Sequence, residues 1–286
     1  MKKTFLFFAI VILLFSGCHS DKVSDIVATT LPVYEFASTL CQGTDITVSR
    51  LITENVSCLH DYSVQVSQMQ AVESAQVVIL SGAGLEDFLD DVLQNANCII
   101  DASCDVEFHE GHTHEHGDHH HEVDPHIWLS PEIAKQMSRT IAYELSAIYP
   151  EHAEVIQQNL IDLLDKLNTL QIYGENKLKD LSCSELITFH DGFGYFAESF
   201  HLNILTAVEE ESGSEASAKM LVSLIEQVKT NHLPAIFTET NGSTAAAEII
   251  ASETGAKIYS LDMAMSGDDY FAAMYHNIDT IKEALG

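Results

Sequence analysis

Short apolar runs rich in β-branched residues alternate along this chain with longer amphipathic stretches. In the first half, the short runs predict strands at 26–30, 46–51, 77–80 and 98–100. The segments between them predict helices at 33–41, 67–74 and 84–95. The pattern returns in the second half, with strands at 186–189, 203–207, 235–238 and 257–261 and helices at 192–200, 214–230, 243–254 and 268–285. Such alternation is typical of βα units whose strands form a parallel sheet.

Local signals mark where several of these helices begin and end. Pro32 lies at the start of the first helix. Ser67, Ser214 and Ser243 are expected as N-caps, because a serine hydroxyl can accept a hydrogen bond from a free N–H group of the first turn. Gly255 is expected to end the helix before it, since glycine readily adopts the left-handed conformation that terminates helices.

Two long helices are predicted in the middle of the chain. Ser130 and Pro131 combine an N-cap with a proline at the first helical position, and the helix continues to about Ile148. Pro150 opens a second stretch whose apolar residues keep helical spacing to about Asp180. A helix of about 30 residues would span roughly 45 Å, which is long for one layer of a single domain. We therefore predict an α/β fold of two lobes, each a parallel sheet flanked by helices, joined by one long rigid helix.

The first residues have the features of an export signal. Lys2 and Lys3 precede an apolar run at 4–15, which is shorter than a membrane span. Ser16-Gly17-Cys18 follows and resembles a bacterial lipobox, in which Cys18 would be lipidated and become the mature N-terminus. An ordinary cleaved signal is the alternative. Two or three acyl chains would anchor the protein at the outer face of a cell membrane.

These features divide the chain into five expected segments. They are a signal peptide at 1–17, a lipidated tether at 18–24, an N-terminal α/β lobe at 25–149, a connecting helix at 150–180 and a C-terminal α/β lobe at 181–286. The first lobe includes the run HEGHTHEHGDHHH at 109–121, in which seven of thirteen residues are histidine. That run offers no apolar residue to a core, so we expect a mobile loop.

The composition bears on partners and on cysteine chemistry. The formal net charge is −30, with 13 basic and 43 acidic residues, which disfavours nucleic acid and anionic membrane surfaces and favours cations. Disulfides are permitted in an exported protein, and Cys41–Cys58 and Cys98–Cys104 are possible pairs, but the sequence leaves the connectivity open, including that of Cys183. A thiolate metal site is disfavoured because no CxxC pair is present.

Candidate chemistry lies where the predicted strands end. His190, Glu239 and Asp262 directly follow strands of the second half, and His60 and His126 lie in loops of the first. Parallel α/β sheets bind ligands beyond the carboxyl ends of their strands, so a cleft between the lobes could gather these side chains. Three imidazoles and one carboxylate complete the tetrahedral shell that Zn²⁺ prefers.

Acidic residues accompany each candidate histidine. A ligating imidazole usually needs an acceptor for its second ring nitrogen. Asp61, Asp124 and Asp191 lie within two residues of the three histidines, although adjacency in sequence does not establish contact.

Five local motifs resemble a known family. They are CLHDYS at 58–63, DPHIWLSP at 124–131, FHDGFGYF at 189–196, FTE at 237–239 and GDDY at 267–270. In order and spacing they are similar, over the whole mature chain, to the solute-binding lipoproteins of zinc and manganese ABC importers. The resemblance implies two α/β lobes bridged by a long helix, with one metal ion bound between the lobes.

The resemblance also implies a ligand set. His60 matches the histidine of the family's His-(Asp/Glu)-Tyr motif, and His126 matches that of the Asp-Pro-His motif. His190 occupies the third site, which is histidine in zinc-type members and often glutamate in manganese-type ones. The fourth ligand would be Asp262 or water, with Glu239 in a supporting role. Cys58-Leu59 departs from the small residue and proline that many relatives have before the first histidine.

The function implied is capture of Zn²⁺ without catalysis, followed by delivery to an ABC permease and its ATPase. The protein would act as a monomer, and the loop at 109–121 would collect metal weakly or serve only as a solvated linker. Mn²⁺ or Fe²⁺ is the alternative cargo. A zinc hydrolase with Glu239 as base and a surface adhesin with structural metal are the competing classes; HExxH, a common hydrolase motif, is absent.

Overall fold

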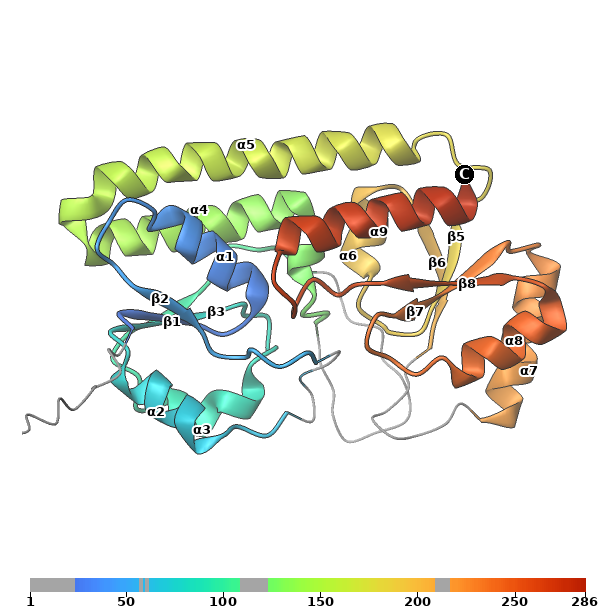
Figure 1. The fold of residues 1–286 in the computed structure, drawn as a ribbon, viewed down its shortest axis with the longest axis horizontal. Coiled ribbons are helices and arrows are strands. Elements are labelled where there is room, and N and C mark those ends of the chain that lie inside the picture. The colour runs from blue at the N-terminus through green and yellow to red at the C-terminus, as the bar shows by residue number, and fades with distance from the viewer. Residues whose placement is uncertain (1–23, 57–58, 60–61, 109–122, 209–216) are drawn as a thin grey trace, which may run out of the picture.

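The computed structural model describes residues 24–56, 59, 62–108, 123–208 and 217–286. Predictions about the signal peptide, Cys18, Cys58, His60, Asp61, the histidine-rich run and Ser214 therefore lie outside the described residues. Figure 1 shows two α/β lobes side by side, with one long helix running along both.

The first lobe is built on a four-stranded parallel sheet in the order β2-β1-β3-β4. Its strands are β1 (Ile26–Ala28), β2 (Val48–Arg50), β3 (Val77–Leu80) and β4 (Ile99–Asp101). The sheet is accompanied by α1 (Leu31–Leu40), α2 (Val66–Ser74), the 3₁₀ turn η1 (Asp87–Leu89) and α3 (Asp90–Leu93). The expected strand positions are confirmed, with ends that shift by one or two residues.

The helix expected at 84–95 is wrong in extent. Gly82, Ala83 and Gly84 all have positive φ, at 83°, 55° and 79°, so this stretch forms a turn instead of a helical start. The chain then makes only η1 and the single turn of α3. The Gly82 position is also crowded, because a Cβ there would lie 2.0 Å from Asp101 Oδ1.

The second lobe repeats the strand order of the first as β6-β5-β7-β8, again all parallel. Its strands are β5 (Glu185–Thr188), β6 (Asn203–Ala207), β7 (Ala235–Glu239) and β8 (Lys257–Leu261). Its helices are α6 (Gly194–Ser199), α7 (Ala218–Thr230), α8 (Ala245–Thr254) and α9 (Tyr270–Leu285). Every residue of β7 is buried, as expected for an inner strand covered on both faces.

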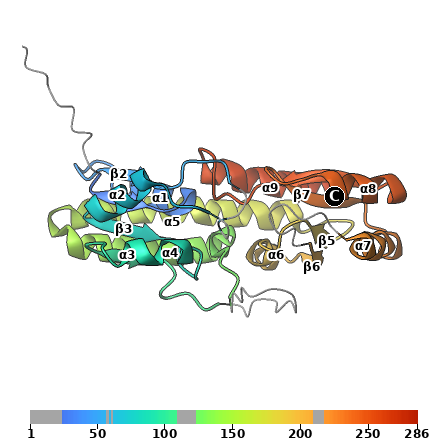
Figure 2. The same ribbon diagram turned by 90° about the horizontal axis from the view of Figure 1, so that it is seen from below.

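One long helix connects the lobes, and it packs against the preceding helix of the first lobe. The turn η2 (Ile127–Leu129) leads into α4 (Pro131–Ile148), and η3 (Pro150–His152) leads into α5 (Ala153–Leu178). The 26 residues of α5 pack against α1 and α4 in the first lobe and against α9 in the second (Figure 1). Seen from below, the lobes lie end to end along this helix (Figure 2). The expected connector is confirmed, although Pro150 opens a 3₁₀ turn and the α-helix begins at Ala153.

The residues that cap the helices can be compared with the caps predicted from the sequence. Ser130 caps α4 by accepting from Ile133 N, and Gly255 ends α8 with a φ of 79°. The cap of α2 is Gln65, whose N–H donates to Gln68 Oε1 at 2.9 Å, so Ser67 is not the cap. The N-caps of α7 and α8 are Ser217 and Thr244, so Ser243 is not the cap of α8.

The lobes share one apolar core. A continuous cluster of buried side chains includes residues of the first sheet, α4, α5 and α9. A second cluster lies between the sheet of the second lobe and helices α7 and α8. Among the described cysteines, Cys41, Cys98, Cys104 and Cys183 are free thiols, so the possible Cys98–Cys104 disulfide is not formed. In the part of the chain that the structure describes, no helix combines the length and apolarity needed to cross a membrane.

Candidate metal centre

His126 is held rigidly in the segment just before α4. Asp124 Oδ1 accepts from the His126 backbone N–H at 2.9 Å and lies 2.9 Å from its ring Nδ1. An aspartate that accepts from the N–H two residues onward forms a compact turn, and the proline between them suits it. His126 is 2 % exposed, so its ring has little freedom to reorient. This confirms Asp124 as the partner of His126.

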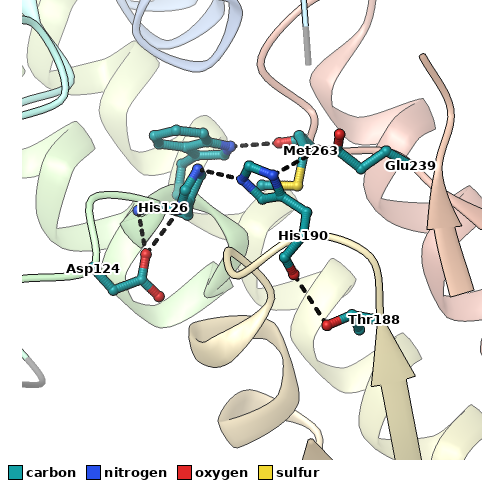
Figure 3. Close-up of polar contacts among 7 residues, drawn as sticks. Asp124, His126, Thr188, His190, Glu239 and Met263 are labelled. Carbon is teal, nitrogen blue, oxygen red and sulfur yellow. Dashed lines mark hydrogen bonds and ion pairs between the residues drawn. The ribbon is translucent and has the colours of Figure 1, made fainter. Parts of the chain in front are cut away.

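His190 approaches from the second lobe. It follows β5, and its Nδ1 lies 3.3 Å from Oε1 of Glu239, the last residue of the adjacent strand β7 (Figure 3). In a sheet with this strand order, the crevice where the order reverses lies between β5 and β7, which is the usual position for a ligand. The carboxylate beside the His190 ring thus comes from a neighbouring strand. Adjacency in sequence had suggested Asp191.

The two imidazoles face each other through their outer nitrogens. Nε2 of His126 and Nε2 of His190 lie 3.2 Å apart, and the ring planes are inclined at 87° (Figure 3). Two nitrogen ligands at about 2.05 Å from a tetrahedral Zn²⁺ would lie about 3.3 Å apart. With each Nδ1 directed at a carboxylate, both Nε2 atoms are left to coordinate one cation.

Gly192 and Met263 close one side of this pair. A Cβ added at Gly192 would lie 2.6 Å from Met263 Cε, 2.7 Å from His190 Cδ2 and 2.9 Å from His126 Nδ1. The absence of a side chain at Gly192 therefore allows both rings and the thioether to approach. Met263 is 5 % exposed, and Figure 3 shows its side chain beside the His190 ring.

Electrostatics favour a cation at this position. Burial raises the pKa of Asp124, but the hydrogen bonds from His126 and the proximity of the His126 and His190 rings outweigh that effect. The pKa of Asp124 consequently lies below its ordinary value, and the carboxylate stays ionised. An ionised partner on Nδ1 makes the opposite ring nitrogen a better metal ligand.

Asp262 follows β8 and is tied into its own loop. Its Oδ1 accepts from Ala264 N at 2.7 Å, while its backbone N–H and C=O pair with the Asn277 side chain at 2.7 and 2.6 Å. Within the described ranges, no group of three or more His, Cys, Asp or Glu side chains is arranged to hold a metal. The structure thus brings His126 and His190 together, and it does not place Asp262 in such a cluster.

Two residues of the site were not anticipated as such from the sequence. Met263 contributes its side chain, and Trp128 donates from Nε1 to the Met263 carbonyl at 2.7 Å. Trp128 stands in the same DPHIWLSP motif as His126, which was the one available signal for it. No sequence pattern pointed to Met263.

Comparisons with known proteins identify the family of the chain. Residues 26–284 match the family model described as zinc-uptake complex component A, periplasmic. The chain belongs to this family. A zinc-binding lipoprotein, AdcA of Streptococcus pneumoniae, is 30 % identical over 99 % of this chain, which spans 61 % of that relative's length.

Solved structures show the same fold. A crystal structure of ZnuA is similar with a TM-score of 0.81 and 30 % identity, covering 92 % of this chain and all of that one. The solute-binding protein FpvC of Pseudomonas aeruginosa, in complex with Ni²⁺, gives a TM-score of 0.78 at 26 % identity, covering 92 % of this chain and 97 % of that one. The expected two-lobed α/β architecture and the family resemblance are both confirmed.

Proposed function

We propose that this protein is the extracytoplasmic solute-binding component of a metal ABC importer, which captures Zn²⁺ and hands it to a membrane permease driven by an ATPase. The observation that carries the proposal is the 3.2 Å separation of the His126 and His190 Nε2 atoms, with a carboxylate on each opposite ring nitrogen. The zinc-uptake family and the zinc-binding relative support the same cargo.

The remaining ligands are proposed from the family motifs. His60 supplies the third imidazole, and Asp262 or a water molecule supplies the fourth position. Glu239 serves to orient His190, because its Oε1 faces Nδ1, on the side of the ring away from His126. Neutral imidazoles bind zinc, so capture weakens as the pH falls through about 6.5, the ordinary pKa of histidine.

The location and organisation are part of the same proposal. A signal at 1–17 is removed, Cys18 carries the lipid and 18–24 forms the tether to the outer face of the membrane. The lobes at 25–149 and 181–286 hold one metal between them, and the helix at 150–180 keeps them in place. The protein acts as a monomer with no catalytic step.

The nickel complex of FpvC shows that this fold also accommodates other divalent cations. Mn²⁺ or Fe²⁺ is therefore the alternative cargo, and a metal-dependent surface adhesin is the alternative role. Imidazole donors of this kind favour Zn²⁺, while selection among divalent metals also depends on geometry and supply.

Metal competition tests the proposal directly. The full chain lacking only residues 1–17 is stripped of metal and titrated with Zn²⁺ against a chromogenic chelator, then with Mn²⁺ and Ni²⁺. We expect one tight zinc ion per molecule, which His60→Ala, His126→Ala or His190→Ala each removes. Deletion of 109–121 leaves that ion in place, and His276→Ala, an exposed histidine on α9, serves as the matched control. Unchanged tight binding by His126→Ala and His190→Ala would refute the assignment.

A further inference from the structure

The segment 263–270 between β8 and α9, here called the interlobe strap, belongs to the second lobe in sequence but is hydrogen-bonded to the first. Leu31 N donates to Met265 O at 3.2 Å, and Ser266 Oγ donates to Val56 O at 3.2 Å. Arg50 Nη1 donates to Gly267 O at 2.5 Å, and Tyr270 N donates to Glu35 Oε1 at 2.8 Å. The strap is thus bonded to the first lobe along most of its length.

Trp128 fastens both ends of the strap. Its Nε1 donates to Met263 O at 2.7 Å, and its own carbonyl accepts from Tyr270 Oη at 2.7 Å. Trp128 and Tyr270 are both fully buried, and the Tyr270 ring packs edge-on against Phe36 of α1 at 5.2 Å between centroids. If the indole N–H were removed, the buried Met263 carbonyl would have no hydrogen bond to offset its desolvation. Losing this bond therefore costs more stability than losing an exposed one.

The same tryptophan contacts the proposed metal centre. Its ring lies against His126, with centroids 5.5 Å apart. Met263, whose carbonyl it holds, places its methyl group against the His126–His190 pair at Gly192. Figure 3 shows Met263 and both imidazoles converging from different segments of the chain. Trp128 therefore connects a histidine of the first lobe to a wall of the site contributed by the second.

We infer that Trp128 is a positioning residue that makes metal affinity depend on the interlobe strap. The inference rests on the proposed function, since it assumes that His126 and His190 bind the cargo. Because the two histidines come from different lobes, their 3.2 Å spacing requires the lobes to be held in register. A site whose ligands are already in place binds metal more tightly, because none of the binding free energy is used to bring the ligands together.

Thermodynamic reciprocity adds a second consequence. If the strap contacts raise metal affinity, bound metal must stabilise the strap contacts to the same degree. Local opening of the strap should become rarer when zinc is bound, and backbone hydrogen exchange reports such opening. The amides of Leu31 and Tyr270 are suitable probes, because both donate hydrogen bonds between the strap and the first lobe.

Two conservative substitutions test the inference. Trp128→Phe removes the N–H while keeping an aromatic ring, and Tyr270→Phe removes only the hydroxyl that holds the Trp128 carbonyl. We expect zinc affinity, measured by chelator competition, to fall about tenfold in Trp128→Phe and severalfold in Tyr270→Phe. Tyr259→Phe is the matched control, because its hydroxyl lies 3.5 Å from Glu283 and takes no part in the strap.

Hydrogen exchange supplies the readout that a purely structural role would not change. In the wild-type protein, zinc should slow exchange at the Leu31 and Tyr270 amides, and Tyr270→Phe should lose most of that effect. Should Trp128→Phe fail to fold, Tyr270→Phe alone decides the matter. The positioning role would be overturned if Trp128→Phe and Tyr270→Phe folded and bound zinc with wild-type affinity, while losing the same thermal stability with zinc as without it. Failure of His190→Ala to weaken binding would instead refute the proposed function.

Discussion

Gly192→Ala is the most direct test of the geometry at the metal centre. The added Cβ would lie 2.6 to 2.9 Å from three atoms, Met263 Cε, His190 Cδ2 and His126 Nδ1. Carbon contacts are comfortable at about 3.5 Å, so the three overlaps amount to about 0.6 to 0.9 Å. The thioether can swing away, but the added Cβ would meet both rings at once, and the rings cannot both move without changing their spacing.

The expected loss follows from the tolerance of metal coordination. Zinc ligands must lie within about 0.2 Å of their ideal distances, so a ring displacement of about 0.6 Å is sufficient to spoil one bond. We expect zinc affinity to fall by about 100-fold or more. Overpacking of this kind should also lower the free energy of unfolding of the metal-free protein by about 1–3 kcal/mol. Chelator competition measures the first quantity and urea denaturation the second.

Gly194→Ala provides the matched control two residues away. A Cβ there meets a single atom, Asp124 Oδ2, at 3.1 Å, and alanine is a better helix former than glycine at the start of α6. Its zinc affinity should stay within about threefold of wild type. Wild-type zinc affinity in Gly192→Ala would refute the reasoning, because it would mean that both histidines can be displaced without cost.

Three further predictions follow from the same structure. Trp128 is the only tryptophan in the sequence and lies against His126, so zinc binding should change the intrinsic fluorescence, and an emission spectrum unaltered by saturating zinc would contradict the placement. Glu239→Ala should weaken zinc binding by about 10- to 100-fold in a competition titration, because it removes the carboxylate beside His190 Nδ1. Burial raises the pKa of Glu35 to about 7, so the folded chain holds a proton there that the unfolded chain releases near pH 4.5, and stability should fall as the pH rises between these values. In Glu35→Gln, the difference in the free energy of unfolding between pH 5 and pH 7.5 should be smaller by about 1 kcal/mol, allowing for the partial exposure of the group. Urea denaturation at the two pH values measures that difference.

Much of the fold was predictable because its signals are local. The runs at 77–80, 203–207 and 257–261 are strands with the predicted bounds, since apolar β-branched residues there are followed by turn residues or helix starts. The stretch at 84–95 was mispredicted because the positive φ of Ala83 is imposed by its surroundings and has no signature in alanine.

The site was predictable only in part. His190 could be singled out because it ends a strand, and His126 because Asp124 and a proline precede it. The partner of His190 could not, because Glu239 reaches it from a neighbouring strand of the sheet. The bond from Trp128 to Met263 joins residues 135 positions apart, and no periodicity relates them. Contacts of this kind depend on how the lobes pack together.

Helix α5 has a consequence for how the chain folds. It is at once a part of the first lobe, through α1 and α4, and of the second, through α9, and the apolar cluster beneath it continues from one lobe to the other. Either lobe expressed alone would expose the surface that this shared helix covers. We therefore expect the two similar sheets to unfold together as one cooperative unit. Sequence segments that look like separate domains would then be halves of one folding reaction.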